Sequence, residues 1–418
     1  MPQKLIDQAT IQPDGRPGDD AFTAFATCND NFEDAEHRLT TLEGGSSNIG
    51  QDLADLKVGL QQEAQLRADA DAAEATARQN ADTALGARFI GKNRFINGDF
   101  RFWQRGTNFP AATGTRYTAD RWNSNGTGSS IWVQRVDVPA GGGTVPLLKN
   151  AKYMLQAVVG SVAGAGNFAL IQQRVEGVRE LSDKTVTVSF KAKASVANFK
   201  VGVEAQQSFG AGGSAGVDSI VSSVTLGTDW QQFSVQLTIP SVVGKTITTG
   251  DYLQISFWLD AGANFAGRSG NAGQKNGTVS IAEVQVEEGT APTPFEYRPD
   301  ALELALCQRY YEKSYDVETQ PGASAREGCV RTGLTGGFFM AMGSVSFKVS
   351  KRSAPAVTTY AARNGAVGQL SEVNSSGSYV ANRSCNPSFI GQQNFNVGGD
   401  AYTAGNNGEY HWTADAEI

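Results

Sequence analysis

Residue types that many enzymes and metal proteins need are scarce in this sequence. Its 418 residues include only two histidines, His37 and His411, so a Ser-His-Asp or Cys-His device has one weak candidate at most. The four cysteines form no Cys-x-x-Cys pair, and a zinc site lacks ligands at suitable spacing. We expect reduced and mostly buried thiols at Cys28, Cys307, Cys329 and Cys385.

Clustered positive charge and long apolar runs are also missing. The net charge is −7 and no basic run occurs, which argues against nucleic-acid binding because phosphates are neutralised by clustered Lys and Arg. No apolar run reaches the roughly 18 to 20 residues that span a bilayer, and the N-terminus has no signal-peptide core. We therefore expect a protein made in a cytoplasm, without a membrane insertion.

Glycine, by contrast, is abundant, with 48 residues, above the usual share of about 7%. Frequent glycines favour frequent turns and hence many short strands. No phosphate-binding loop of the G-x-x-x-x-G-K-[ST] type accompanies them. A glycosidase needs only two carboxylates, so composition alone leaves that activity open, but no regular internal repeat of a β-helix occurs. We expect a protein that is not an enzyme.

The N-terminal part of the chain predicts a thin helical shaft. Residues 1–29 are polar and rich in turns, and residues 30–92 contain two helical runs, 32–43 and about 51–88. Apolar residues in both runs recur at heptad steps, as in Leu53, Leu56 and Leu60. The middle of the second run carries mostly alanine and has little to bury against a globular surface. Pairing with other copies of the chain is therefore favoured over a single helix packed on its own domain.

Residues 93–298 switch to a period of two, which predicts β-strands. Alternation is clear in 185–193, 233–239 and 253–259, with Gly- and Ser-rich turns between the strands. Short strands with one polar face predict an antiparallel sandwich, of which a jelly roll is favoured. In the last strand, a change of phase near Ala282 and Glu283 predicts a β-bulge.

The remainder divides into a linker helix, 299–313, and a β-rich domain, 314–418. Asp300 and Glu303 have the spacing of a capping box at the start of the helix. The C-terminal domain contains few core-sized residues between Gly365 and Gly399. We expect this domain to complete its core against sister chains and to form the tip. The predicted fold is thus mainly β, with an N-terminal coiled coil, a jelly roll and a β-rich tip.

Several segments resemble those of bacteriophage tail fibres and related virion fibre proteins with a carbohydrate-binding-module-like jelly roll. The opening of the β-domain, from Asn93 to Gly106 and from Tyr117 to Trp122, is the strongest resemblance, followed by Glu303 to Glu312 at the linker. The segment from Gln12 to Asp20 and the C-terminal segment from Gly408 also resemble this family.

The resemblance implies a homotrimer that is attached by its N-terminus to the phage tail or to other virion proteins. Its β-domains would contact a glycan or a protein on the host surface, and the protein would reside in the virion. A structural calcium is common beside the first and last strands of such modules, which implies Asp99 and Glu283 as ligands. The sequence departs from the family pattern at Arg101, where an acidic residue is usual.

Sugar binding uses aromatic faces together with a few hydrogen-bonding side chains. In the jelly roll, Trp258 alternates with the apolar set of its strand and is therefore the predicted surface ring. Tyr402, Tyr410 and Trp412 are the corresponding candidates in the tip. Packing in a core is the alternative for each ring. Two other functions stay open at this point, a structural head or collar fibre that binds virion proteins and a glycan depolymerase.

Overall fold

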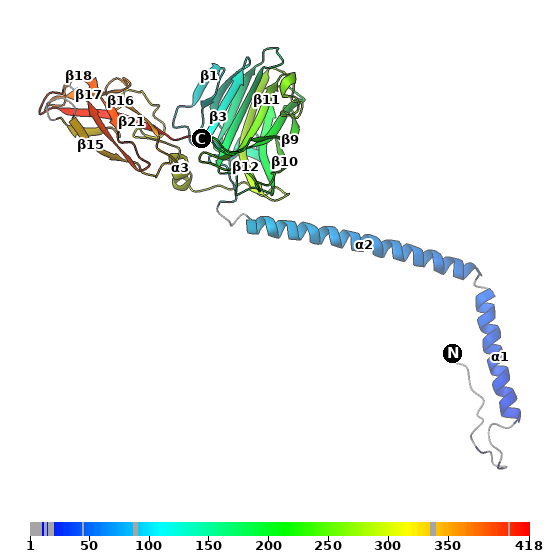
Figure 1. The fold of residues 1–418 in the computed structure, drawn as a ribbon. Coiled ribbons are helices and arrows are strands. Elements are labelled where there is room, and N and C mark those ends of the chain that lie inside the picture. Colours follow the sequence, from blue (N-terminus) through cyan, green and yellow to red (C-terminus); the bar gives the residue numbers. More distant parts are fainter. Residues whose placement is uncertain are drawn as a thin grey trace. The chain divides into compact units, whose positions relative to one another are not determined.

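The computed structural model describes residues 11, 15, 21–43, 46–86, 91–334, 340–399 and 402–418. The chain divides into two compact units, Met1–Ala84 and Leu85–Ile418, whose elements are drawn in Figure 1. Most of the predicted attachment segment, 1–29, lies outside the described residues, as do Gly44 and Gly45 in the predicted helix break. The described part is mainly β, with antiparallel sheets and few helices.

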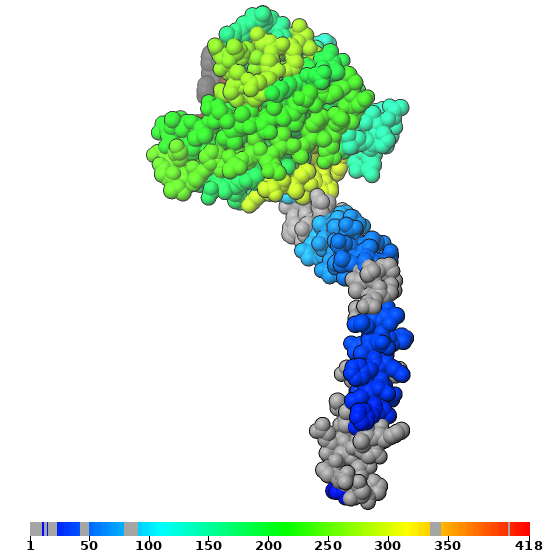
Figure 2. All heavy atoms as spheres, turned by 90° about the vertical axis from the view of Figure 1, so that its right-hand side faces the viewer, coloured from blue at the N-terminus to red at the C-terminus, as the bar shows by residue number. Residues whose placement is uncertain are grey.

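The first unit consists of two helices, α1 (Ala21–Glu43) and α2 (Ser46–Gly86). Both begin earlier than the apolar periodicity predicted. Leu53, Leu56 and Leu60 of the predicted heptad are between 51% and 61% exposed in the single chain, and Figure 2 shows the side chains of α1, in dark blue, uncovered on the face drawn. Pairing of these helices with other copies stays a prediction. Among the described residues, no helix combines the length and the apolar character that a membrane span requires.

The second unit begins with a sandwich of two six-stranded antiparallel sheets, and consecutive strands repeatedly cross from one sheet to the other, as in a jelly roll. In spatial order, the first sheet consists of β1 (Asn108–Ala112), β4 (Ser130–Asp137), β5 (Tyr153–Gly160), β12 (Gly277–Glu288), β7 (Thr185–Ala194) and β10 (Gln231–Thr238). The second consists of β2 (Arg116–Tyr117), β3 (Trp122–Thr127), β6 (Phe168–Glu176), β11 (Tyr252–Ala261), β8 (Phe199–Ser208) and β9 (Val217–Leu226). Short 3-10 turns occur at η1 (Ala140–Gly142), η2 (Pro146–Leu148) and η3 (Ala263–Phe265).

The core of the sandwich lies between the two sheets and follows the predicted alternation. Trp122 is fully buried at its centre, with ring centroids 5.1 Å from Phe95, 5.0 Å from Phe100 and 6.2 Å from Phe257. The strands predicted at 185–193, 233–239 and 253–259 are β7, β10 and β11. The inward side chains of β11, including Leu253, lie in this core. The alternation therefore predicted the buried face of this strand correctly.

The predicted bulge in the last strand is also confirmed. The pairing of β12 with β7 shifts register between Ala282 and Gln285. Glu283 has a φ of 49°, a left-handed conformation that side-chain-bearing residues rarely adopt. The bulge turns Val284 and Val286 into the core beside Val279 and Ile281, so it restores the inward face that an uninterrupted strand would lose.

The C-terminal domain is built around β21 (Asn407–Asp415), which pairs with four other strands. Its sheet contains β13 (Tyr311–Lys313), β14 (Val330–Gly333), β16 (Ala356–Ala361), β17 (Gln369–Val373), β18 (Tyr379–Ser384) and β21, and a second sheet contains β15 (Met340–Ser346), β20 (Asn394–Gly399) and β19 (Asn386–Ser388). Phe347, Phe395 and Trp412 pack together in a core between them. Distant segments of one chain supply these aromatic rings, and the expectation that sister chains complete the core stays a prediction.

The linker differs from its prediction at both ends. Helix α3 (Asp300–Gln308) ends before residue 313, since Tyr311–Lys313 pairs with β21 instead. Among the described residues, no side chain caps its N-terminus. The prediction of a capping box is wrong. Glu303 instead turns inward, where it accepts hydrogen bonds from the Asn97 main chain and from Arg298 at 3.1 Å.

Charged side chains fasten the C-terminal domain to the jelly roll. Arg121, whose side chain is only 1% exposed, forms an ion pair with Glu417. Arg105 lies 2.9 Å from Asp415 and 3.4 Å from Glu417, and its guanidinium covers the Tyr311 ring at 3.7 Å. The last residue of β21 and the residues after it therefore form a polar contact between the two β-domains, with Arg121 and Glu417 buried in it.

Candidate binding groove

The outward face of the second sheet carries a row of polar side chains instead of a uniformly charged surface. Adjacent strands place Gln172 of β6, Gln254 of β11 and Gln206 of β8 on this face, because each alternates with core residues of its strand. A hollow of about 220 Å³ lies over these strands, which we call the groove. Its lining comprises Asn125, Phe168, Leu170, Gln172, Arg174, Gln206, Tyr252, Gln254, Trp258, Phe265 and Arg268.

One wall of the groove is aromatic. The ring of Trp258 lies 5.5 Å from Phe168 and 5.4 Å from Phe265, and those two rings are 5.0 Å apart. Phe265 belongs to η3, so the turn after β11 folds back over the end of the strand. Both phenylalanines are partly exposed while Trp258 is nearly covered. The wall therefore offers phenylalanine edges and faces, with Trp258 as their support.

The floor of the groove is a chain of hydrogen bonds between side chains. Arg174 donates to Gln254 over 2.9 Å, Gln254 donates to Ser256 over 3.2 Å, and Ser256 donates to Gln172 over 3.1 Å. Gln254 also donates to Gln206 over 3.3 Å. In the described part of the chain, the side-chain nitrogens of Gln172 and Gln206 donate no hydrogen bond. Two oriented amide donors are thus left for a ligand.

The charges beside the floor are held in place by partners. Glu204 is fully buried and accepts hydrogen bonds from the Trp258 indole at 2.9 Å and from Arg268 at 2.6 and 3.0 Å. At the opposite end, Arg174 lies 4.5 Å above the Tyr252 ring. These contacts fix the side chains before a ligand arrives, which lowers the entropic cost of binding. With about 220 Å³, the groove is smaller than the roughly 300 Å³ at which drug-sized pockets begin, and suits single ring-sized groups.

The groove contains one of the four predicted ligand-binding rings. Trp258 points away from the core, as its alternation predicted, but it is only 2% exposed because Phe168, Phe265 and Arg268 cover it. The expectation that it is an open surface ring is wrong in that respect. The structure adds residues that the sequence analysis missed, above all Gln172, Gln206, Gln254, Arg174 and Tyr252. Their outward phase in β6, β8 and β11 was a usable signal.

The three predicted rings of the tip lie in its interior. Tyr402 is 6% exposed, Tyr410 is 0% and Trp412 is 4%. Alternation along β21 could not separate Tyr410 and Trp412 from surface rings, because both faces of this central strand are covered. As exposed ligand-binding faces these three predictions are wrong.

The predicted calcium ligands are already neutralised by cations of the chain. Lys191 forms an ion pair with Glu283, and Arg101 bridges Asp99 and Asp300. Among the described residues, no group of three or more His, Cys, Asp or Glu side chains could hold a metal ion. Asp99 and Glu283, both about 95% buried, therefore do not fit a calcium ion, since a second cation would have to displace an ammonium or a guanidinium.

The histidine in the last strand has a structural environment. His411 is fully buried, stacks on Tyr315 with ring centroids 3.7 Å apart, and bonds Ser314 through Nδ1 over 2.9 Å and the Ala325 carbonyl through Nε2 over 3.1 Å. Both ring nitrogens are occupied, so this Ser-His pair has no free nitrogen for proton transfer to a ligand. Burial lowers the pKa of His411.

No protein-family model matches this chain, and no curated protein is similar to it in sequence. Solved structures give distant likenesses. A family 11 carbohydrate-binding module from Clostridium thermocellum is 13% identical with a TM-score of 0.27, covering 43% of this chain and 98% of the module. An enzymatically active tailspike domain of bacteriophage CBA120 is 16% identical with a TM-score of 0.27, covering 47% of this chain and 22% of that one. A xylan-binding domain from Paenibacillus barcinonensis is 12% identical with a TM-score of 0.25, covering 45% and 99%. With every TM-score below 0.5, nothing about function is transferred from these proteins.

Proposed function

We propose that this chain is the subunit of a trimeric phage tail fibre whose jelly roll binds a host-surface glycan in the groove. The observation that carries the proposal is the combination of two amide donors, on Gln172 and Gln206, with the aromatic wall around Trp258. Neither amide donates a hydrogen bond to any of the residues that the structure describes. Sugars present an apolar ring face and several hydroxyl groups, so this combination suits them.

The helical unit supports the fibre part of the proposal. Its heptad leucines are more than half exposed in the single chain, and burying them between copies would stabilise helices that bury little by themselves. The N-terminal end would then attach to the tail or to another virion protein. In this proposal the protein resides in the virion and binds without cleaving, so a glycan incubated with it keeps its length.

Binding of the full-length protein to an array of bacterial surface glycans tests this proposal. Gln206→Ala and Tyr252→Ala alter partly exposed side chains of the groove and leave the sandwich core intact. Each lost hydrogen bond or stacking contact is expected to weaken binding about 2- to 10-fold. Gln232→Ala is the matched control, because Gln232 is an exposed glutamine on the outer face of β10 in the other sheet.

The alternatives give different results in the same experiment. A structural head or collar fibre binds no glycan and is found on the capsid or collar by immunolabelling of phage particles. A depolymerase shortens the polymer during incubation. Glycan binding that both groove variants retain in full would show that the groove is not the site.

A further inference from the structure

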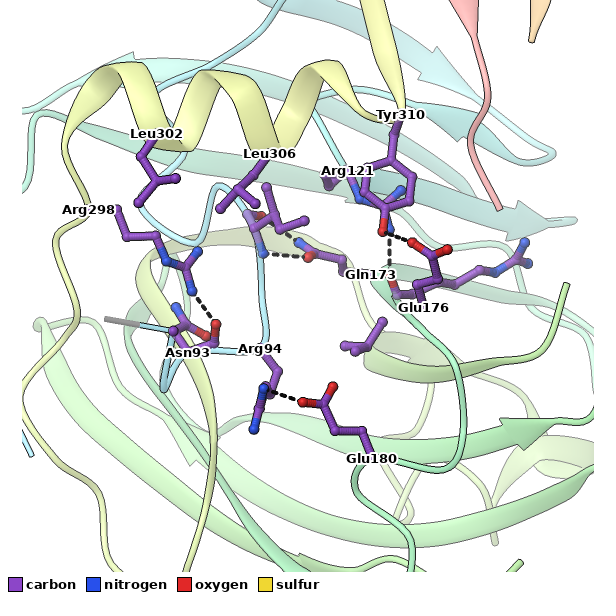
Figure 3. Close-up of a pocket in the computed structure, with 14 residues that line it drawn as sticks. Asn93, Arg94, Arg121, Gln173, Glu176, Glu180, Arg298, Leu302, Leu306 and Tyr310 are labelled. Atoms are coloured by element: carbon purple, nitrogen blue, oxygen red, sulfur yellow. Dashed lines mark hydrogen bonds and ion pairs between the residues drawn. The ribbon is translucent and has the colours of Figure 1, made fainter. Parts of the chain in front are cut away.

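A second hollow lies at the other side of Arg174, between α3 and the start of the jelly roll. It has a volume of about 320 Å³, within the range of about 300 to 1,000 Å³ that ligand pockets occupy. Figure 3 shows α3 over it, with the segment after Gly91 and the end of β6 forming the other walls. Nothing in the proposed glycan site requires this pocket.

The upper wall of the pocket is apolar. Leu302 and Leu306 extend from α3 into it, and Ile96 and Val175 line it from the jelly roll. Leu302 is 37% exposed, although a helix that packs on a sheet normally buries its leucines. The pocket therefore leaves apolar surface in contact with water that a ligand could cover.

The hydrogen-bond acceptors that line the pocket already have donors, whereas some of its donors have no acceptor. Gln173 uses both side-chain polar atoms on the Ile96 main chain, at 2.8 and 2.9 Å. Glu176 accepts from Arg309 at 2.9 and 3.1 Å and from Tyr310 at 2.7 Å. By contrast, within the described residues the Nε atoms of Arg94 and Arg121 are buried and have no hydrogen-bond partner.

The charged side chains that line the pocket are also mostly cationic. Four arginines line the pocket, namely Arg94, Arg121, Arg174 and Arg298, against two glutamates, Glu176 and Glu180. In the part of the chain that the structure describes, Glu180 is the only partner of the Arg94 guanidinium, at 2.6 Å, and that carboxylate is 55% exposed. A pair this exposed contributes little stability, so an incoming carboxylate can take the place of Glu180 on Arg94.

We propose that this pocket binds a small carboxylate with a branched aliphatic body, its carboxylate on Arg94 and its body against Leu302 and Leu306. A free branched-chain acid and the C-terminal carboxylate of a peptide ending in leucine share this chemistry. Arg121 remains behind the ligand, stacked 3.4 Å over the Tyr310 ring and ion-paired with Glu417, so Arg94 is the cation that holds the carboxylate.

Calorimetric titration of the full-length protein tests the proposal with 4-methylpentanoate, its neutral amide 4-methylpentanamide, and acetate. The acid is expected to bind at least 10-fold more tightly than either of the others, because the amide lacks the charge and acetate lacks the body. N-acetyl-leucine against N-acetyl-leucinamide, titrated in parallel, distinguishes a peptide terminus from a free acid as the preferred source.

Variants locate the site. Arg94→Gln is expected to weaken binding of the acid at least 10-fold, and Leu302→Ala to weaken it several-fold, with unchanged unfolding temperatures because both side chains are partly exposed. Arg179→Gln removes an exposed arginine that does not line the pocket and is the control. Equal binding of acid and amide, no binding of the acid, or full binding by Arg94→Gln would each overturn the proposal. Glycan binding is measured separately, so either proposal can fail alone.

Discussion

At the scale of single residues, His411 makes the stability of the tip depend on pH. Burial lowers its pKa from the ordinary value of 6.5, so the folded tip holds it neutral while the unfolded chain takes up a proton. Its contribution is therefore fully present above pH 6.5 and is lost as pH falls toward the lowered value, by at most about 1.4 kcal/mol per pH unit.

Urea unfolding followed by hydrogen exchange of β21 measures this effect. The tip is expected to lose stability between pH 7 and pH 5, and His411→Gln is expected to flatten that pH dependence while lowering stability at every pH. An unchanged slope in the variant would assign the acid sensitivity to other groups.

The second prediction at this scale concerns Lys191, whose ammonium group lies beside Glu283 where a metal ion was predicted. Lys191→Gln leaves Glu283, a carboxylate 4% exposed, without its cation, and removal of one partner from a buried pair costs about 3 to 5 kcal/mol. Added CaCl₂ is expected to raise the unfolding temperature of the variant, because Glu283, beside the Tyr297 hydroxyl, then lacks a cation, whereas Asp99 keeps Arg101. The wild-type protein is expected to show the same unfolding temperature in CaCl₂ and in EDTA, and a lower one in EDTA would contradict the prediction.

At the level of single residues, the sequence predicted the direction in which a side chain points better than its exposure to solvent. The alternation in β11 gave the outward direction of Trp258 correctly, but the rings that cover it come from β6 and η3, at distances in sequence that no local pattern encodes. Likewise, the family resemblance implied Asp99 and Glu283 as calcium ligands, whereas the cation on Glu283 comes from Lys191 of a strand paired with it. Side-chain environment depends on register between distant strands, which the sequence does not state.

At the scale of elements, periodicity predicted the features that burial of apolar side chains determines. The bulge of β12 was visible because four valine and isoleucine side chains must all reach one core. Helix α3 was extended too far, because Tyr310 and Tyr311 suit a helix as well as a strand and only pairing with β21 decides between them. Propensity is overridden where tertiary hydrogen bonds compete.

Helix α2 carries the prediction that belongs to this scale. Replacing Leu53, Leu56 and Leu60 by serine removes the predicted seam, so the proposed trimer of full-length chains is expected to dissociate to single chains and to lose helical circular dichroism. Serine also lowers helix propensity, and the variant Ala54→Ser, Gln61→Ser, Gln62→Ser on the other faces controls for that. Light scattering reports the mass. A wild-type protein with the mass of one chain would exclude the shaft.

At the scale of the whole second unit, the contact after β21 decides whether the jelly roll and the tip move together. Glu417 is the only acidic partner of Arg121 among the described residues, and both side chains are at most 4% exposed. Arg121 also donates to the Arg174 main chain, and Arg174 lines both the groove and the second pocket. The tip thus holds in place a residue shared by the two candidate sites.

Glu417→Gln should therefore loosen this contact, because it leaves the Arg121 guanidinium buried with a neutral partner, at a cost of about 3 to 5 kcal/mol. The cores of the jelly roll and the tip are untouched, so calorimetry is expected to resolve two transitions for these domains where the wild-type protein is expected to show one. Limited proteolysis is expected to cut the segment between residues 289 and 299. Asp316→Gln, which alters an exposed carboxylate outside the contact, controls for the lost charge. A single transition at the wild-type temperature would contradict the prediction, because it would mean that the remaining contacts, such as Arg105 with Asp415, couple the domains without the Arg121–Glu417 pair.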